Sequence, residues 1–231
     1  MHNLAIIPAR GGSKRIPRKN IKSFLGKPII SYSIEAAIRS NLFDEVMVST
    51  DDEEIAEISI KYGAKVPFIR SNSNSNDFAS TYDVIDEVSK EYFKRDIFFD
   101  FTCCLYACAP FVNDSKLKES FQMLISNEYD SVLPIMPFGF PIQRALKIVN
   151  NNRITFLNPA NSITRSQDLE KLYHDAGQFY WINNLTFKNK KEILTENTGY
   201  YMLSELEGQD IDNEVDWKLA ELKYELLQSI K

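Results

Sequence analysis

Short apolar runs rich in β-branched residues alternate along the chain with longer stretches in which apolar residues recur at helical spacing. The runs predict strands, because their near-continuous apolar character is typical of a sheet that is covered on both faces. The stretches predict amphipathic helices. We expect strands at Leu4–Pro8, Glu45–Ser49, Phe98–Leu105 and Ser131–Pro134, and helices at Ile29–Ser40, Glu53–Tyr62, Thr81–Phe93 and Ser115–Ser126.

This alternation predicts βαβ units with right-handed crossovers. The expected fold class is therefore α/β, with a doubly wound, mostly parallel, Rossmann-like sheet. Ligands of such sheets bind outside the carboxyl ends of the strands. Two of the helices begin with the spacing of a capping box, Thr50 with Glu53 and Ser80 with Asp83.

The pattern changes after Pro137. Ala145–Val149 and Arg153–Phe156 alternate around three asparagines, which predicts an antiparallel hairpin. No Gly/Ser-rich linker precedes it, so we expect residues 1–231 to form a single domain with a small antiparallel insertion, or arm, at about 137–176. Strands at Phe179–Ile182 and Tyr200–Leu203 and a helix at Asp216–Ser229 are expected to follow.

The composition, 44% hydrophobic and 26% charged over 231 residues, is that of a globular protein with a sizeable core. No apolar run approaches the ~18 residues that span a bilayer, and the first residues lead directly into a strand. We therefore expect a cytoplasmic protein that does not bind membranes. Adjacent Cys103 and Cys104 would point to opposite faces of a strand, which disfavours a disulfide framework. A metal site at these cysteines is weakly supported, because no His or further Cys beyond Cys108 lies nearby.

The net charge of −5 argues against a general nucleic-acid binder. The charge is unevenly distributed, however. Residues 10–27 contain seven basic residues and no acid, whereas the stretch from Glu205 to Glu225 is rich in acids. A local basic segment on an acidic protein indicates a small polyanionic ligand.

The basic segment includes the loop PARGGSKRIPRKN, directly after the first strand. Gly11 and Gly12 permit positive φ and close approach of the backbone, so that amide groups can face phosphate oxygens. Arg10, Lys14 and Lys19 would neutralise a triphosphate and the charge that develops on its transfer. The sequence lacks the G-x-G-x-x-G fingerprint, and its Gly-Lys pair is followed by proline, so a dinucleotide site is disfavoured and a P-loop is excluded.

Near the C-terminus, Asp210 and Asp212 flank Ile211 in an extended segment, which places both carboxylates on one side. Mg²⁺ favours one or two carboxylates together with phosphate oxygens and water, so the pair predicts a site at which Mg²⁺ would polarise the α-phosphoryl group. Two acids at this spacing are common by chance, so the pair alone is a weak signal, and the prediction depends on its combination with the glycine loop and with a family resemblance. Asp216 is expected to cap the last helix.

These motifs resemble a known family. The runs IPARGGSKRIPRKN, GKPIISYSIEAA, VMVSTDDEEIAE, FIRSNSNSNDFAST and DIDNEVDW, with Thr164–Arg165, are similar to the cytidylyltransferases that activate sialic acids and related 2-keto sugar acids, over essentially the whole chain. The resemblance implies a nucleotidyltransferase sheet, CTP and a nonulosonic acid as substrates, and Mg²⁺ as cofactor. It also implies a homodimer whose contact is the arm, where Ile142, Ile148 and Phe156 would otherwise be exposed.

The resemblance implies roles for individual residues at the nucleotide. Arg70 and the Ala79–Thr81 turn would hold the cytosine, although Ser80 and Thr81 also suit plain helix capping. Asn20 would join the cations at the phosphates and ribose. The residues expected to bind the nucleotide are Ala9, Arg10, Gly11, Gly12, Ser13, Lys14, Lys19, Asn20, Arg70, Ala79, Ser80 and Thr81, and those expected to act in catalysis are Arg10, Lys14, Lys19 and Asp212.

On the sugar side the chain departs from typical sialic-acid enzymes. Tyr106 replaces a Gln that is expected to contact the sugar, and Asn213 replaces a frequent Thr. Pro141–Arg144 and Tyr173–Trp181 are similar to the pseudaminic acid branch of the family, which implies a less hydroxylated, deoxy acceptor. Legionaminic, N-acetylneuraminic and 3-deoxy-octulosonic acids are alternative acceptors, and a non-catalytic nucleotide-binding protein is the alternative from another class.

The expected reaction is attack of the anomeric hydroxyl of the sugar acid on the α-phosphorus of CTP, which releases pyrophosphate. Arg165 would grip the substrate carboxylate. His174 could act as a base or be merely structural, and the strand that contains Tyr180 also suits a core position. The residues expected at the sugar acid are Tyr106, Gln143, Arg144, Arg165, His174, Gln178 and Tyr180.

Overall fold

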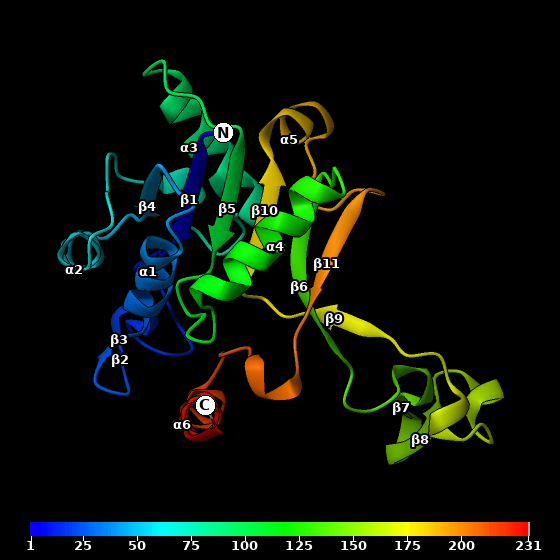
Figure 1. Ribbon diagram of the computed structural model, residues 1–231. Coiled ribbons are helices and arrows are strands. Elements are labelled where there is room, and N and C mark those ends of the chain that lie inside the picture. Colours follow the sequence, from blue (N-terminus) through cyan, green and yellow to red (C-terminus); the bar gives the residue numbers. More distant parts are fainter. Residues whose placement is uncertain (231) are drawn as a thin grey trace.

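The computed structural model describes residues 1–230, which form a central twisted sheet with helices on both faces (Figure 1). The sheet has seven strands, in the order β11-β6-β10-β5-β1-β4, with β9 alongside β6. The strands of one direction are β1 (Asn3–Pro8), β4 (Glu45–Ser49), β5 (Phe101–Leu105), β6 (Ser131–Pro137) and β11 (Thr198–Met202). The strands of the opposite direction are β9 (Tyr173–Asp175) and β10 (Phe179–Asn183). The predicted mostly parallel α/β sheet is confirmed.

Two layers of helices bury the two faces of this sheet (Figure 1). One layer consists of α1 (Ile29–Ser40), α2 (Glu53–Lys61) and α4 (Asp114–Ser126). The other consists of α3 (Thr81–Phe93) and α5 (Asn184–Lys190). A last helix, α6 (Glu214–Ile230), packs on a separate apolar cluster beside the short strands β2 (Ser23–Phe24) and β3 (Lys27–Pro28).

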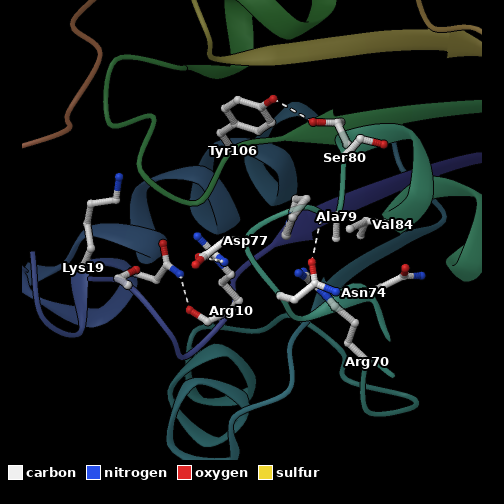
Figure 2. A pocket seen from close by; sticks show the side chains of 14 residues that line it. Arg10, Lys19, Arg70, Asn74, Asp77, Ala79, Ser80, Val84 and Tyr106 are labelled. Atoms are coloured by element: carbon white, nitrogen blue, oxygen red, sulfur yellow. Dashed lines mark hydrogen bonds and ion pairs between the residues drawn. The ribbon is translucent and has the colours of Figure 1, made fainter. Parts of the chain in front are cut away.

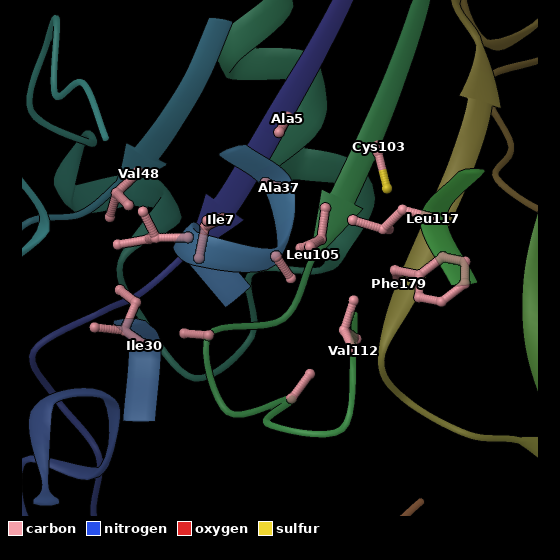
Figure 3. Packing of buried hydrophobic residues seen from close by; sticks show 14 of the residues in the cluster. Ala5, Ile7, Ile30, Ala37, Val48, Cys103, Leu105, Val112, Leu117 and Phe179 are labelled. Atoms are coloured by element: carbon pink, nitrogen blue, oxygen red, sulfur yellow. The ribbon is translucent and has the colours of Figure 1, made fainter. Parts of the chain in front are cut away.

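Side chains of each strand alternate between the two layers, as the period of two along a strand requires. Ala5 and Ile7 of β1 pack with the helices of the first layer (Figure 3), whereas Ile6 packs with those of the second. Cys103 and Cys104 likewise belong to opposite faces, and both thiols are free. The sequence prediction that these adjacent cysteines point to opposite faces of a strand is therefore confirmed.

The predicted arm leaves the sheet after β6 and returns at β9 (Figure 1). Its hairpin consists of β7 (Leu146–Val149) and β8 (Arg153–Phe156), which pair antiparallel as expected. Short 3₁₀ turns make up much of the rest. Ile148 is 80% exposed and Ile163 is 92% exposed, while Phe156 is half-buried. The arm thus presents apolar side chains to solvent within this protomer.

Several details differ from the sequence prediction. α2 is capped by Asp52, whose carboxylate accepts from the Ile55 amide at 3.0 Å, and not by a box that involves Thr50. The Thr50 hydroxyl accepts from the Asp52 amide instead. The capping box of Ser80 and Asp83 at α3 is confirmed. β5 begins at Phe101, later than expected, and β9 and α5 were not predicted.

No helix within residues 1–230 is both long enough and apolar enough to cross a membrane.

Candidate active site

A pocket of about 260 Å³ opens at the carboxyl edge of the sheet, beyond the ends of β1 and β5 (Figure 2). This is the place where ligands bind in doubly wound folds. Its wall combines cations, amides and a tyrosine. The residues that line it are Pro8, Arg10, Ser13, Lys19, Asn20, Arg70, Asn74, Asn76, Asp77, Ala79, Ser80, Thr81, Val84 and Tyr106. Eight of the twelve residues expected at the nucleotide are among them; Ala9, Gly11, Gly12 and Lys14 are not.

Two of the expected phosphate-binding cations converge on one carboxylate. Arg10 Nη1 lies 2.6 Å from Asp77 Oδ1, and Lys14 Nζ lies 2.5 Å from Asp77 Oδ2. Hydrogen bonds from Lys14 and then Arg10 hold the pKa of Asp77 below its usual range. An anionic group therefore already sits between these two cations, which is the position that the glycine loop was predicted to offer to phosphate.

The two glycines of the loop have different roles from those expected. Neither has a positive φ. A Cβ on Gly11 would lie 2.6 Å from Asp52 Oδ2, so a side chain there is excluded by close approach, whereas a Cβ on Gly12 would meet nothing. The Gly11 amide donates to Asp51 Oδ1 at 2.9 Å and is not free for phosphate.

Asp52 is held in that close position by Arg18, which has the left-handed φ of 55°. Arg18 donates to both Asp52 oxygens, at 2.5 and 2.9 Å, and the hydrogen bond from Arg18 is the main cause of the lowered pKa of Asp52. The loop is thus fastened to the start of α2 by a bidentate ion pair.

Asn20 and Lys19 fasten the other end of the loop. Asn20 Nδ2 donates to the Arg10 carbonyl at 2.9 Å, and its Oδ1 accepts from the Cys108 thiol at 3.3 Å. Burial raises the pKa of that thiol to about 12, so Cys108 is a neutral donor. Lys19 Nζ donates to the Ile211 carbonyl at 2.8 Å, which joins the basic loop to the acidic segment far along the chain.

At the far end of the pocket, Arg70 is 5% exposed and donates through Nε to Ser49 Oγ at 2.9 Å. Burial lowers its pKa from the ordinary value. Ala79 and Ser80 belong to the turn into α3 and lie on the same side of the pocket (Figure 2), and Thr81, the next residue, also lines it. The Ser80 hydroxyl and amide are committed to the Asp83 capping box, and the Ala79 amide donates to Asn76 Oδ1 at 3.0 Å. The carbonyl groups of this turn and Thr81 are therefore what it can offer to a base.

The acidic pair has the predicted arrangement. Ile211 is 3% exposed and packs under α6, while Asp210 and Asp212 face away from that core. Burial, followed by the charge of Asp212, raises the pKa of Asp210. Asp212 Oδ2 accepts from Arg15 Nη1 at 2.6 Å, and its Oδ1 lies 4.0 Å from Lys19 Nζ.

Two neighbouring carboxylates that repel one another suit a hard divalent cation, which would offset their charge. Among residues 1–230, no group of three or more Asp, Glu, His or Cys side chains gathers as a metal cluster. The pair would therefore need phosphate oxygens and water to complete an octahedron, which is the usual situation for Mg²⁺.

The start of α6 holds the acidic pair in place. Asn213 Oδ1 accepts from the amides of Val215 and Asp216, at 2.8 and 3.1 Å, and is the N-cap. Asp216 Oδ2 accepts in return from the amides of Asp212 and Asn213, at 2.9 and 3.0 Å. The predicted capping role of Asp216 is confirmed, and Asn213 is the residue that begins the cap.

On the sugar side, Tyr106 and Tyr180 lie together. The Tyr106 hydroxyl is 2.8 Å from Thr81 Oγ1, and its ring centroid is 5.5 Å from that of Tyr180. Tyr180 donates to Asp175 Oδ2 at 2.5 Å. Tyr106 therefore touches the nucleotide end of the pocket as well as the strand that was expected to hold the sugar.

The remaining expected sugar-binding residues do not line this pocket within one protomer. Gln143 and Arg144 donate to Glu170 O and Ser166 Oγ, and Arg165 forms a bidentate pair with Asp168, all inside the arm. His174 is exposed and bonds to the carbonyl of Asp175. Gln178 is buried, and its amide nitrogen donates to the Glu207 carbonyl at 2.6 Å.

Four residues that line this site or contact its expected members were not predicted from the sequence: Arg15, Asn74, Asp77 and Asp175. Only Asp77 carried a usable signal, because it is the one acid in the polar loop that leads to the turn at Ala79–Thr81. The ion pair of Arg15 with Asp212 joins residues that are 197 positions apart, and nothing in local sequence indicates it.

A doubly wound sheet with a cation-rich pocket at its carboxyl edge and an acidic pair beside it is the arrangement of a nucleotidyltransferase. The chain belongs to the cytidylyltransferase family, whose model matches residues 4–223.

Two relatives and one solved structure place it further. A pseudaminic acid cytidylyltransferase of Campylobacter jejuni is 43% identical over 226 residues, which cover 98% of this chain and 97% of the relative. A CMP-N,N′-diacetyllegionaminic acid synthase of Legionella pneumophila is 30% identical over 237 residues, with 99% and 98% covered. The structure of a CMP:2-keto-3-deoxy-manno-octonic acid synthetase complexed with CTP is similar in fold, with a TM-score of 0.70, 18% identity and 99% and 100% covered.

Proposed function

We propose that the protein transfers CMP from CTP to the anomeric hydroxyl of pseudaminic acid and releases pyrophosphate. The observation that carries the proposal is the convergence, at one sheet edge, of Arg10 and Lys19 with the acidic pair. The relative from Campylobacter jejuni, a pseudaminic acid cytidylyltransferase of nearly the same length, supports the choice of acceptor.

Residues of the pocket and of the segments beside it would bind different parts of the substrates. Arg10, Lys14 and Lys19 would neutralise the triphosphate and the charge that develops on the leaving pyrophosphate. The turn at Ala79–Thr81 would hold the cytosine. Asp210 and Asp212 would hold Mg²⁺, which polarises the α-phosphoryl group when bound. The protein would thus act mainly by orienting two substrates and stabilising charge.

We further propose a homodimer in which the arm of one protomer reaches the sugar pocket of the other. Arg144 and Arg165 lie on the arm, outside the pocket of their own chain. The exposed Ile148 and Ile163 favour a protein contact at this arm. A second copy could therefore supply the carboxylate-binding arginine that one protomer does not bring to its own pocket.

Pyrophosphate release tests this function. Purified protein with Mg²⁺ should release pyrophosphate only when CTP and a nonulosonic acid are both present. ATP or GTP should not replace CTP, because the proposed pyrimidine site at Arg70 and Ala79–Thr81 would not admit a purine. A panel of pseudaminic, legionaminic, N-acetylneuraminic and 3-deoxy-octulosonic acids identifies the acceptor. No pyrophosphate release with any of them would support the alternative of a non-catalytic nucleotide-binding protein.

A further inference from the structure

The outer face of α6 carries an apolar stripe along its whole length. The side chains are 75%, 42%, 63%, 46% and 67% exposed at Val215, Leu219, Leu222, Leu226 and Ile230 respectively. The first four recur at spacings of four, three and four residues, which is the alternation of core positions in a heptad. A stripe of this kind on the surface of a protein marks an interface.

The stripe is not needed to hold α6 on its own chain, because the opposite face of the helix does this. Trp217 and Ala220 are buried there, and the ring of Trp217 packs edge-on against Phe24 at 5.6 Å. Tyr224 packs against Phe24 at 5.7 Å. The helix is therefore firmly seated while its second apolar face has no covering within residues 1–230.

Charged residues on the two flanks of the stripe indicate what covers it. Lys218 and Glu225 lie along one flank and are exposed, and neither forms an ion pair within the described part of the chain. Asp216 and Lys223 lie along the other flank, are half-buried and bond to their own chain, Asp216 within the cap of α6 and Lys223 by donating to the Gly208 carbonyl at 2.9 Å. Each flank thus carries one acid and one base, in opposite order along the helix.

That order distinguishes the two ways in which identical helices can pair. In an antiparallel pair, residues of one flank meet the same flank of the other helix, so Lys218 of each copy faces Glu225 of the other. In a parallel pair, Lys218 would face Lys223, and like charges would repel. The surface is therefore complementary to itself in the antiparallel orientation only.

We propose that α6 binds α6 of a second copy of this chain as an antiparallel pair. Leu219 of one copy packs against Leu222 of the other, and Val215 packs against Leu226, about a twofold axis near residues 220 and 221. Two ion pairs between Lys218 and Glu225 flank this core. The contact is isologous and uses a different surface from the arm.

A pair of helices about 25 Å long buries less surface than a typical stable interface, so the association should depend on protein concentration. Sedimentation equilibrium should show a concentration-dependent step in the wild type. Leu222→Glu should weaken that step at least about a hundredfold, because two buried leucines are lost. Leu185→Glu, at a residue of α5 that is 70% exposed, is the matched control and should leave the step unchanged. Turnover per active site should be unaffected in both variants.

Charge exchange tests the orientation. Lys218→Glu and Glu225→Lys should each weaken self-association roughly four- to thirtyfold, because both ion pairs become repulsive. The double variant should recover the wild-type constant, and the two single variants should associate with each other better than with themselves.

Other occupants of the stripe give different results. A stronger association of Lys218→Glu would indicate a parallel pair and overturn the proposed orientation. If Ile148→Glu in the arm abolished the same step and charge exchange had no effect, the stripe would be covered by the arm of a second copy and the proposal would be wrong. A monodisperse mass that Leu222→Glu does not change would also overturn it.

Discussion

The hydroxyl of Tyr106 lies 2.8 Å from Thr81 Oγ1, at the first turn of α3. Tyr106 follows β5, and Thr81 belongs to the turn that lines the end of the pocket proposed to hold the cytosine. A residue that was expected to contact the sugar therefore also supports the wall of the proposed nucleotide site. Because its ring lies against Tyr180, a substitution at Tyr106 should change the binding of both substrates.

The first prediction concerns acceptor choice. Because Tyr106 replaces a Gln that would contact the sugar, a hydroxyl of N-acetylneuraminic acid should be left without its partner, which costs about 1–3 kcal/mol. Pseudaminic acid should therefore exceed N-acetylneuraminic acid in kcat/KM by roughly ten- to over a hundredfold. Tyr106→Gln should narrow this ratio, chiefly by weakening the preferred acceptor, since an amide replaces a large apolar ring. Initial rates with both sugar acids at saturating CTP measure the ratio.

Tyr106→Phe is the matched variant, because it keeps the ring and removes only the hydroxyl, with its bond to Thr81 and its interaction with the Tyr180 hydroxyl. It should raise the KM for CTP while leaving the ratio between the two acceptors closer to that of the wild type. Equal turnover of both acids by the wild type would contradict the choice of acceptor but not the reaction class.

Much of the fold follows from local pattern, and the site follows only in part. α1 and α3 have the predicted bounds, because their apolar residues repeat cleanly and Ser80 caps α3. The glycine loop was placed correctly because β1 must deliver it to the carboxyl edge. The need for Gly11 was misread, however, since it arises from Asp52, which Arg18 pulls into contact from a distant part of the chain.

The sugar side could be predicted least. Tyr173–Trp181 resembles a binding segment, but the structure uses it as β9 and β10, with Trp181 fully buried and Gln178 committed to the Glu207 carbonyl. Whether a side chain on a strand faces core or ligand depends on which helices cover that face. The sequence of the strand alone does not contain this information.

A second prediction concerns the carboxylates proposed to hold Mg²⁺. Asp212→Asn should abolish Mg²⁺-dependent pyrophosphate release with the fold intact, because an amide cannot supply the charge that Mg²⁺ requires. Asp210→Asn should have the same effect, less completely. Circular dichroism checks the fold, and Asp86→Asn, which removes a surface pair with Lys90, is the control that should keep full activity. Undiminished activity of the wild type in excess EDTA would remove the metal from the reaction.

A third prediction uses the raised pKa of Asp210. For a carboxyl group whose folded pKa is raised, protonation favours the folded state, so its contribution to stability is lost as pH rises from the ordinary value near 3.8 through the raised pKa. Asp210→Asn should therefore have a higher Tm than the wild type at pH 7 in EDTA. The gain in Tm on adding Mg²⁺ should be lost in this variant. A lower Tm in EDTA would show that Asp210 is stabilised as an anion.

The same carboxylate must be ionised to bind a cation. Binding of Mn²⁺, followed by electron paramagnetic resonance, should therefore weaken as pH falls through the raised pKa of Asp210. An affinity that declines only near pH 3.8 would mean that burial and Asp212 do not govern this group.

The last prediction concerns the arm. Arg165→Ala should impair every 2-keto sugar acid alike, because this arginine would hold the carboxylate that they share. Within one protomer Arg165 pairs with Asp168 and lies outside the pocket.

If Arg165 serves the pocket of a second copy, an Arg165→Ala protomer keeps an intact pocket and an Asp212→Asn protomer keeps an intact arm. Co-expressing the two inactive variants with different tags and isolating the hybrid should then restore activity, because one of its two sites has every residue it needs. The hybrid of Arg165→Ala with the Arg165→Ala, Asp212→Asn double variant is the control and should stay inactive. A hybrid no more active than its parents would mean that each arm serves its own chain.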